Sequence, residues 1–460
     1  MTNTINVREL KPAKIDNRTF YSRLWQLTLP IALQSFMLAS VAAADALMLG
    51  RIAQNEMAAV SLATQVQFVQ NIFVLGITSA GSILGAQYWG KGDKKTMREL
   101  FNMMIRFSVA VSLIFFLGCE LTPGLLMRIF THDPVLIEIG MPYLRIAGWS
   151  YLLTGISQCY LSMMKVTDHV RESAVIGSSA VVMNIIFNAV LIFGLLGLPR
   201  MEARGAALAT TIARALELLF CLILSTRDGY LTPDFAHFFK DRKELLLSFV
   251  RQCLPLMGGS LLWGVGFTSY TAIIGHLGAD AAASNSIAAV IRDLACCVCN
   301  GIATAAAIMV GNELGAGNLA EGKAYGYKLR NFSFVLGFAS TAFILAITPL
   351  VVRMVKLTPK AHSYLTGMMI VMAFYMIGRV VNTIMINGVM DSGGDTLFDM
   401  YSLAVSMWGL AIPLALAGAF FFHWPVVAVY ACTCVDEVGK IPWVLIHFRK
   451  CIWVQDLTIH

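Results

Sequence analysis

Residues 89–93 read Trp-Gly-Lys-Gly-Asp, and residues 314–318, which follow 225 positions later, read Leu-Gly-Ala-Gly-Asn. The same offset places residues 30–93 on residues 255–318 without a gap. The matched positions include Leu29-Pro30 with Leu254-Pro255, Ser35 with Ser260, Ala58 with Ala283, and Gly76-Ile77 with Gly301-Ile302. Prolines, glycines and loops that match at one offset argue against a chance likeness of apolar residues. The sequence therefore predicts an internal duplication.

The composition predicts a chain whose solvent is lipid. Of 460 residues, 57% are hydrophobic and only 13% are charged, whereas soluble proteins carry about 25% charged residues. A helix needs about 20 apolar residues to cross a bilayer. We predict twelve such spans, at about 23–49, 57–87, 99–120, 136–163, 172–196, 205–225, 247–276, 282–311, 328–352, 363–389, 396–422 and 426–447.

The repeat and the spans together predict the fold class. The offset equals about six spans, an even number, so both copies should have the same orientation in the membrane. We expect an all-α polytopic membrane protein with twelve transmembrane helices in two pseudo-symmetric six-helix lobes. The domains would be an amino-terminal lobe (1–225), a cytoplasmic linker (226–246) and a carboxy-terminal lobe (247–460). Two repeats of parallel orientation are typical of secondary transporters.

The basic residues predict the orientation of the chain. Cytoplasmic loops carry an excess of lysine and arginine, and the net charge of +7 gathers in short loops beside the spans rather than in a nucleic-acid patch. The richer side includes Lys11, Lys14, Arg18, Lys91, Lys94, Lys95, Arg98, Lys323, Lys328, Arg330, Arg449 and Lys450. We expect both termini in the cytoplasm and no nucleic-acid partner. The first apolar run is too long for a signal-peptide core, so we expect it to be an anchor.

The cysteines and histidines do not predict an enzyme or a metal site. Ten cysteines are scattered within apolar runs, as in Cys296-Cys297-Val298-Cys299, without metal-site spacing to histidines. We interpret them as packing residues with free thiols. The sequence has no His-Glu-x-x-His motif and no paired-histidine motif. An ion channel would not need a fused repeat. We therefore expect no enzyme activity, no cofactor and no metal centre.

Several motifs in order resemble the multidrug and toxic compound extrusion (MATE) family, and the likeness extends from about residue 20 to residue 450. They are Leu27-Thr28-Leu29-Pro30, Ala44-Asp45-Ala46-Leu47-Met48-Leu49-Gly50, the segment Ala86–Asp93, Asn312-Glu313-Leu314-Gly315-Ala316-Gly317, and Asp391-Ser392-Gly393-Gly394-Asp395-Thr396. The resemblance implies a V-shaped bundle of two lobes that expels cationic amphiphiles and is driven by a proton or sodium gradient. It also implies a monomer in a bacterial inner membrane.

Three residues of the amino-terminal half are candidates for cation coupling. Asp45 is a single carboxyl in an apolar span, and ionisable residues in spans are functional hypotheses by default. The family's amino-lobe coupling aspartate falls on this position, and its mate in the repeat is Tyr270. Asn184 and Asn188 share a helix face at i,i+4 spacing, where they would either support a coupled cation or hydrogen-bond between helices. We expect Arg214 and Glu217 to form a structural pair.

The carboxy-terminal half carries different charges. Some family members have an acid at the position of Trp263 and another near Val380, and their absence argues against a sodium site of that pattern. A polar cluster is expected instead from Arg292, Asp293, Arg379, Asp436 and Glu437, in which Arg379 would pair with Asp293 or with the acidic pair. Its role would be coupling or helix packing. Aromatic rings that would line a substrate cavity, or simply pack, are Trp263, Phe267, Tyr270 and Tyr375.

We therefore predict a secondary active antiporter that exports cationic or amphiphilic small molecules in exchange for protons. Sodium needs several oxygen ligands, and Asp45 with two amides offers few. A sodium-coupled exporter remains one alternative. The other is a flippase for lipid-linked precursors, whose anionic head groups would call for more arginines and lysines within the spans than this sequence has.

Overall fold

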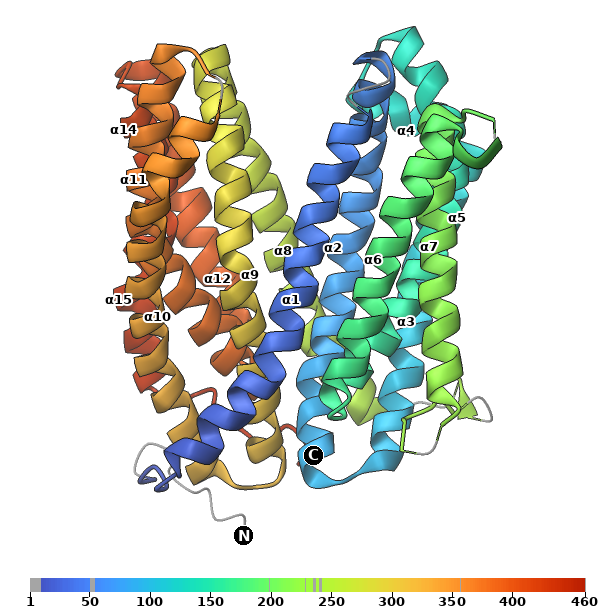
Figure 1. The fold of residues 1–460 in the computed structure, drawn as a ribbon. Coiled ribbons are helices and arrows are strands. Elements are labelled where there is room, and N and C mark those ends of the chain that lie inside the picture. The colour runs from blue at the N-terminus through green and yellow to red at the C-terminus, as the bar shows by residue number, and fades with distance from the viewer. Residues whose placement is uncertain are drawn as a thin grey trace. The chain divides into compact units, whose positions relative to one another are not determined.

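A computed structural model describes residues 10–49, 54–197, 199–227, 229–234, 237–239, 242–355 and 357–459. Within helices, the side chains of residues 41–49, 54 and 196 lie outside this description. In the described ranges all regular secondary structure is helical (Figure 1). The all-α fold class predicted from the sequence is thereby confirmed.

The long helices follow the predicted spans closely. The first half contains α1 (Asn17–Leu49), α2 (Gln54–Lys91), α3 (Lys94–Leu121), the short α4 (Pro123–Phe130), α5 (Pro134–Val166), α6 (Val170–Phe193), η1 (Leu195–Gly197) and α7 (Glu202–Ser225). The second half begins with α8 (Lys243–His276), α9 (Ala279–Gly315), α10 (Leu319–Met354) and α11 (Pro359–Asn382). It ends with η3 (Thr383–Met390), η4 (Asp391–Gly393), α12 (Thr396–Leu403), η5 (Ala404–Ala411), α13 (Ile412–Leu416), η6 (Ala417–Phe421), α14 (Val426–Thr433) and α15 (Val435–Arg449).

Nine helices in the described part of the chain are long and apolar enough to cross a membrane. The three other predicted spans correspond to α1 and α5, each 33 residues long, and to the pair α14–α15. The eleventh span is not a uniform α-helix, because η5 and η6 are π-helical segments. Pro413 lies two residues after η5, and a wider turn relieves the clash between a proline ring and the preceding helical carbonyl.

The described residues form two compact units. One unit contains Leu33–Gly85 and Asp93–Cys253, and in it α5 packs on α3, α6 and α7. The other contains Leu254–His460 together with the described residues up to Ala32 and the segment Ala86–Gly92. In this second unit α11 packs on α9, α10, α14 and α15. The unit boundaries within α1 and α8 lie beside Pro30 and Pro255, the matched prolines of the repeat.

Within the second unit, the ends of α2 and α9 cross through residues that are mates in the repeat. A side chain at Gly90 would clash with the backbone carbonyl of Asn312, and one at Gly315 would clash with that of Gln87. Gly311 in turn faces the β-carbon of Ala86. The first two contacts are therefore one contact made twice, once from each copy of the repeat, and the third joins two residues that are mates of each other, as in a two-fold interface. Glycine is required here because the two backbones touch.

The two amides at this crossing bind different segments. Gln87 donates from Nε2 to the backbone oxygen of Ser392 (2.7 Å), and its Oε1 accepts from the amide of Leu457 (2.6 Å). Its mate Asn312, with the amide turned to satisfy both of its groups, accepts from Arg23 Nη2 at 3.0 Å. The crossing is thus held by the carboxy-terminal segment on one side and by α1 on the other.

Candidate ion-coupling and substrate site

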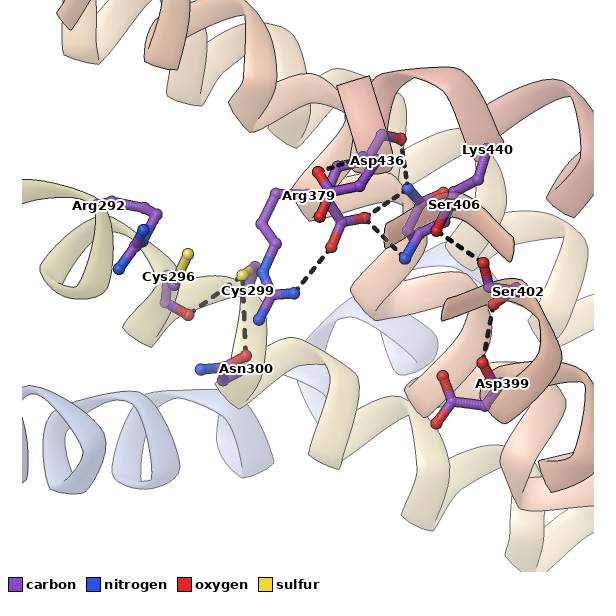
Figure 2. Close-up of polar contacts among 12 residues, drawn as sticks. Arg292, Cys296, Cys299, Asn300, Arg379, Asp399, Ser402, Ser406, Asp436 and Lys440 are labelled. Carbon is purple, nitrogen blue, oxygen red and sulfur yellow. Dashed lines mark hydrogen bonds and ion pairs between the residues drawn. The ribbon is translucent and has the colours of Figure 1, made fainter. Parts of the chain in front are cut away.

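The predicted carboxy-terminal polar cluster centres on the buried carboxylate of Glu437. Glu437 Oε1 accepts from Arg379 Nη1 at 2.9 Å, and Oε2 faces Lys440 Nζ at 3.0 Å. Asn382 Nδ2 donates to both Oε2 and the backbone oxygen of Glu437, each at 2.7 Å. Figure 2 labels Arg379 and Lys440 and marks these contacts with dashed lines. The ion pair expected between Arg379 and the acidic pair therefore forms with Glu437.

Helix spacing explains why these groups meet. Arg379 and Asn382 lie three residues apart on α11 and its end, and Glu437 and Lys440 have the same spacing on α15, so each pair shares a helix face. The two helices approach closely because Gly378 has no side chain, and a β-carbon there would clash with the backbone of Glu437. All four side chains are therefore positioned by one helix–helix contact.

Asp436 connects this cluster to α8. Its Oδ2 accepts from the hydroxyl of Tyr270 at 3.2 Å, and its Oδ1 accepts from the backbone amide of Glu437 at 2.7 Å. Asp436 and Glu437 are both buried. Two acids and two bases thus lie together, and buried charges are tolerated in proteins when they are paired and hydrogen-bonded.

Arg292 and Asp293 form a separate pair and do not join this cluster. Arg292 donates to Asp293 Oδ1 from Nε (3.0 Å) and Nη2 (2.8 Å). The Asp293 side chain is 62% exposed, whereas that of Arg292 is 14% exposed. The guanidinium of Arg292 lies 4.2 Å from the ring centroid of Phe267. The five predicted polar residues therefore divide into two groups, and Arg379 pairs with Glu437 rather than with Asp293.

Three of the four predicted aromatic residues share one face of α8. Trp263 stacks on Phe267 with centroids 5.3 Å apart, and Phe267 meets Tyr270 edge-on at 6.3 Å. Met407 and Leu403 pack with these rings. Tyr375 comes from α11 and is buried one turn before Arg379. The guanidinium of Arg292 already occupies one face of Phe267. The cation that this aromatic group stabilises is therefore a side chain of the protein.

The amino-terminal candidates are only partly described. Asp45 belongs to α1, but its side chain lies outside the described residues. Asn188 Nδ2 donates to Asn184 Oδ1 at 3.2 Å, and Asn184 Nδ2 donates to the hydroxyl of Thr210 at 3.1 Å. These bonds bring the two amides together and connect α6 to α7.

A second buried carboxylate lies in the first unit. Glu217 accepts from Arg214 Nη1 at 2.7 Å and from the hydroxyl of Ser157 at 2.5 Å. The i,i+3 pair expected from the sequence is therefore present, but Ser157 was not predicted. Lys440 and Asn382 were also missed in the second unit, although each lies three residues from a residue that was predicted. That spacing was the available signal.

Comparison with known proteins agrees with the repeat. The MatE family model matches residues 30–190 and again residues 255–417, so its two matches begin at the offset of the duplication. The uncharacterized transporter YisQ of Bacillus subtilis is 23% identical over 454 residues, which cover 97% of this chain and 96% of that protein. A probable multidrug resistance protein NorM of Mesorhizobium japonicum is 23% identical, with 88% of each chain covered.

Solved structures share the fold. A mutant of the MATE transporter VcmN of Vibrio cholerae superposes with a TM-score of 0.88 at 15% sequence identity, covering 96% of this chain and 99% of that chain. At this identity the likeness concerns the fold alone.

Proposed function

The chain belongs to the MATE family of efflux transporters, and on this premise we propose that it is a secondary active antiporter that exports cationic or amphiphilic small molecules in exchange for protons. Multidrug resistance proteins among its relatives support organic molecules as the cargo. The chain is a membrane transport protein, and the coupling ion and the charge of the cargo are the parts that we propose.

One observation carries the choice of coupling residue. Among the acids singled out in the sequence, Glu437 is held by two cations and an amide, and Asp436 by a tyrosine hydroxyl. Asp293 and Glu217 pair with Arg292 and Arg214, respectively. Their charges are already satisfied within the protein, which favours structural roles for them. Asp45 is the remaining acid, and its carboxyl would take up a proton from outside and release a cationic drug. Drug and proton would then compete for one negative charge, as antiport requires.

The sodium-coupled alternative receives less support. Asn184 and Asn188 bond to each other and to Thr210, so the oxygen of Asn184 already accepts a hydrogen bond. A hard cation such as sodium favours several oxygen ligands. One carboxylate with these amides would supply too few oxygen ligands for sodium, whereas a proton needs only the carboxylate.

The flippase alternative would need basic side chains that are free to bind a pyrophosphate. In the described residues Arg379 and Lys440 pair with Glu437, Arg292 pairs with Asp293, and Arg214 pairs with Glu217. Each of these four bases thus has an acidic partner. This pairing favours cargo that carries no strong negative charge.

The test is efflux of a fluorescent cation from proteoliposomes under a pH or a sodium gradient imposed separately. We expect the wild-type protein to respond to the pH gradient alone. Asp45→Asn should fold normally and lose at least about 90% of gradient-driven efflux, because the amide imitates the protonated carboxyl. Asp391→Asn is the matched control, since Asp391 is another buried aspartate in the apolar part of the chain.

Two results would refute the proposal. One is efflux that follows the sodium gradient at fixed pH. The other is a result in which the Asp45→Asn variant still transports and the Asp391→Asn variant does not. That result would indicate a coupling site in the carboxy-terminal unit.

We further propose that the protein is a monomer in a bacterial inner membrane, with lobes at 1–225 and 247–460 and both termini in the cytoplasm. The even number of spans and the distribution of lysine and arginine support this orientation.

A further inference from the structure

Cys296 and Cys299 are unusual among the ten cysteines of this sequence. They are the only two that lie three or four positions apart, which is the spacing that places side chains on the same face of a helix. Cys432 and Cys434 lie two positions apart, and such residues do not face each other on a helix.

The structure brings the two cysteines into contact on α9. Cys299 Sγ donates to the backbone oxygen of Cys296 at 3.1 Å, so its side chain points back along the helix toward Cys296. The i,i+3 spacing places both side chains on the same face of α9. Both cysteines are buried, and Figure 2 shows them together beside Arg379.

The thiol pair borders the polar cluster without belonging to it. Arg379 lies beside the pair in Figure 2, and its guanidinium binds Glu437 at 2.9 Å. On the other side, Cys299 Sγ lies 4.0 Å from Asn300 Oδ1, and Asn300 is exposed. A small reagent can therefore approach the pair from the side of Asn300, and no step of the proposed antiport uses either sulfur.

We propose that Cys296 and Cys299 form a dithiol site for trivalent arsenicals. Sulfur is a soft ligand, and two thiols fixed side by side can chelate one arsenic atom. In the reaction with hydrated phenylarsine oxide, each thiol gives up its proton, two As–S bonds form and two As–O bonds break. Two water molecules leave, and arsenic stays trivalent, so no oxidant or reductant is needed. The reagent is neutral and apolar enough to reach a buried site through the bilayer.

Closing this ring would also affect transport, a consequence that rests on the proposed function. An arsenic bridge removes both thiol protons and draws the sulfur of Cys296 toward Cys299. The bridge would alter the packing beside Arg379, whose guanidinium binds Glu437. We therefore expect an arsenical to inhibit efflux by disturbing the polar cluster from one side.

The binding test does not depend on transport. Purified protein in detergent is titrated with phenylarsine oxide, and the adduct is counted by intact-protein mass spectrometry. We expect one tight adduct that 2,3-dimercaptopropanol removes. Cys296→Ser and Cys299→Ser should each weaken it roughly 100-fold, because chelation through a second bond is lost. Cys432→Ser and Cys434→Ser, which leave the pair intact, should bind as the wild type does.

Monodisperse elution in size-exclusion chromatography establishes that each variant is folded. A tight adduct that persists in both Cys296→Ser and Cys299→Ser would overturn the proposal, and so would one that Cys432→Ser removes. In proteoliposomes, phenylarsine oxide should inhibit the wild type and spare Cys299→Ser. An adduct without inhibition would refute the link to the polar cluster, while a protein that transports nothing would leave the binding result standing.

Discussion

Glu437 is a buried carboxylate with a base on either oxygen, which makes it sensitive to removal of its charge. Arg379 and Lys440 lie 2.9 and 3.0 Å from it, and the side chains of Lys440 and Glu437 are 7% and 4% exposed. Taking such charges out of water is costly, and their mutual attraction offsets the cost only while every partner is present. The cluster therefore specifies how α11 contacts α15 more than it adds to stability.

Glu437→Gln should destabilise the protein by about 3 kcal/mol, because it leaves the buried Lys440 and the partly buried Arg379 without this anion. The measurement is the free energy of unfolding in a denaturing-detergent titration, followed by tryptophan fluorescence. Asp293→Asn is the matched control. Its carboxylate is 62% exposed and pairs with Arg292 at the surface, so we expect a loss below about 1 kcal/mol. Equal losses in the two variants would contradict this account of the cluster.

The sequence identified the charged residues of the cluster but not all of the side chains that they contact. The pairing of Arg379 with the acidic pair was predicted because a lone charge in an apolar helix needs a counter-charge. Which face of α11 meets α15 depends on the contact at Gly378, which hydropathy does not reveal. Lys440 and Asn382 therefore became visible as partners only in the structure.

Most of the long helices begin earlier than the apolar runs that predicted them. The third span was predicted to start at residue 99, but α3 starts at Lys94, where Asp93 caps it by accepting from the amide of Thr96 at 3.0 Å. Hydropathy locates the part of a helix that contacts lipid, whereas helices continue into water until a capping residue ends them. The π-helical segments were missed because hydropathy does not report backbone hydrogen bonding.

The crossing of α2 and α9 makes a prediction about single glycines. Gly315→Ala should destabilise the protein by at least about 1–3 kcal/mol, because its β-carbon would overlap the backbone oxygen of Gln87, and overpacking costs this much. Gly275→Ala in α8 is the control, since nothing lies within 4 Å of a β-carbon there. It should be neutral or slightly stabilising, because alanine favours helices over glycine.

Thermal aggregation midpoints of the two purified variants would distinguish them. If Gly315→Ala melts with the wild type, the backbones at the crossing are not in contact and the account fails. The same clash at Gly90, the repeat mate of Gly315, predicts a similar loss for Gly90→Ala.

Over the whole molecule, duplication explains the fold but not the site. The family model matches twice at the offset found in the sequence, and the contacts at the α2–α9 crossing are reciprocal. The chemistry is not duplicated, because the mate of Asp45 in the repeat is Tyr270. Tyr270 has no carboxylate, and its hydroxyl donates to Asp436. The fold could be predicted from the periodic features that both copies keep. The site could not, since it is built from positions at which the copies differ.

The last prediction concerns the orientation of the whole chain. Twelve spans are an even number, so both termini must lie on one side of the membrane. That side should be the cytoplasm, because the turns after α2 and α9 lie on the same side as the termini and carry Lys91, Lys94, Lys95 and Lys323. Lysine and arginine in short loops resist translocation. Green fluorescent protein fused after His460 should therefore fluoresce, and alkaline phosphatase fused there should be inactive.

A fusion one span earlier supplies the control for this experiment. Residues 422–425 separate η6 from α14, so reporters joined after Trp424 follow eleven spans. Green fluorescent protein joined there should not fluoresce, and alkaline phosphatase joined there should be active. The same readout at Trp424 and His460 would mean that α14–α15 does not cross the membrane, and the predicted count of twelve would be wrong. A reversal of both readouts would keep the count but invert the orientation. In that case Asp45 would lie toward the cytoplasmic side of the membrane, although the proton gradient would still set the direction in which the cargo moves.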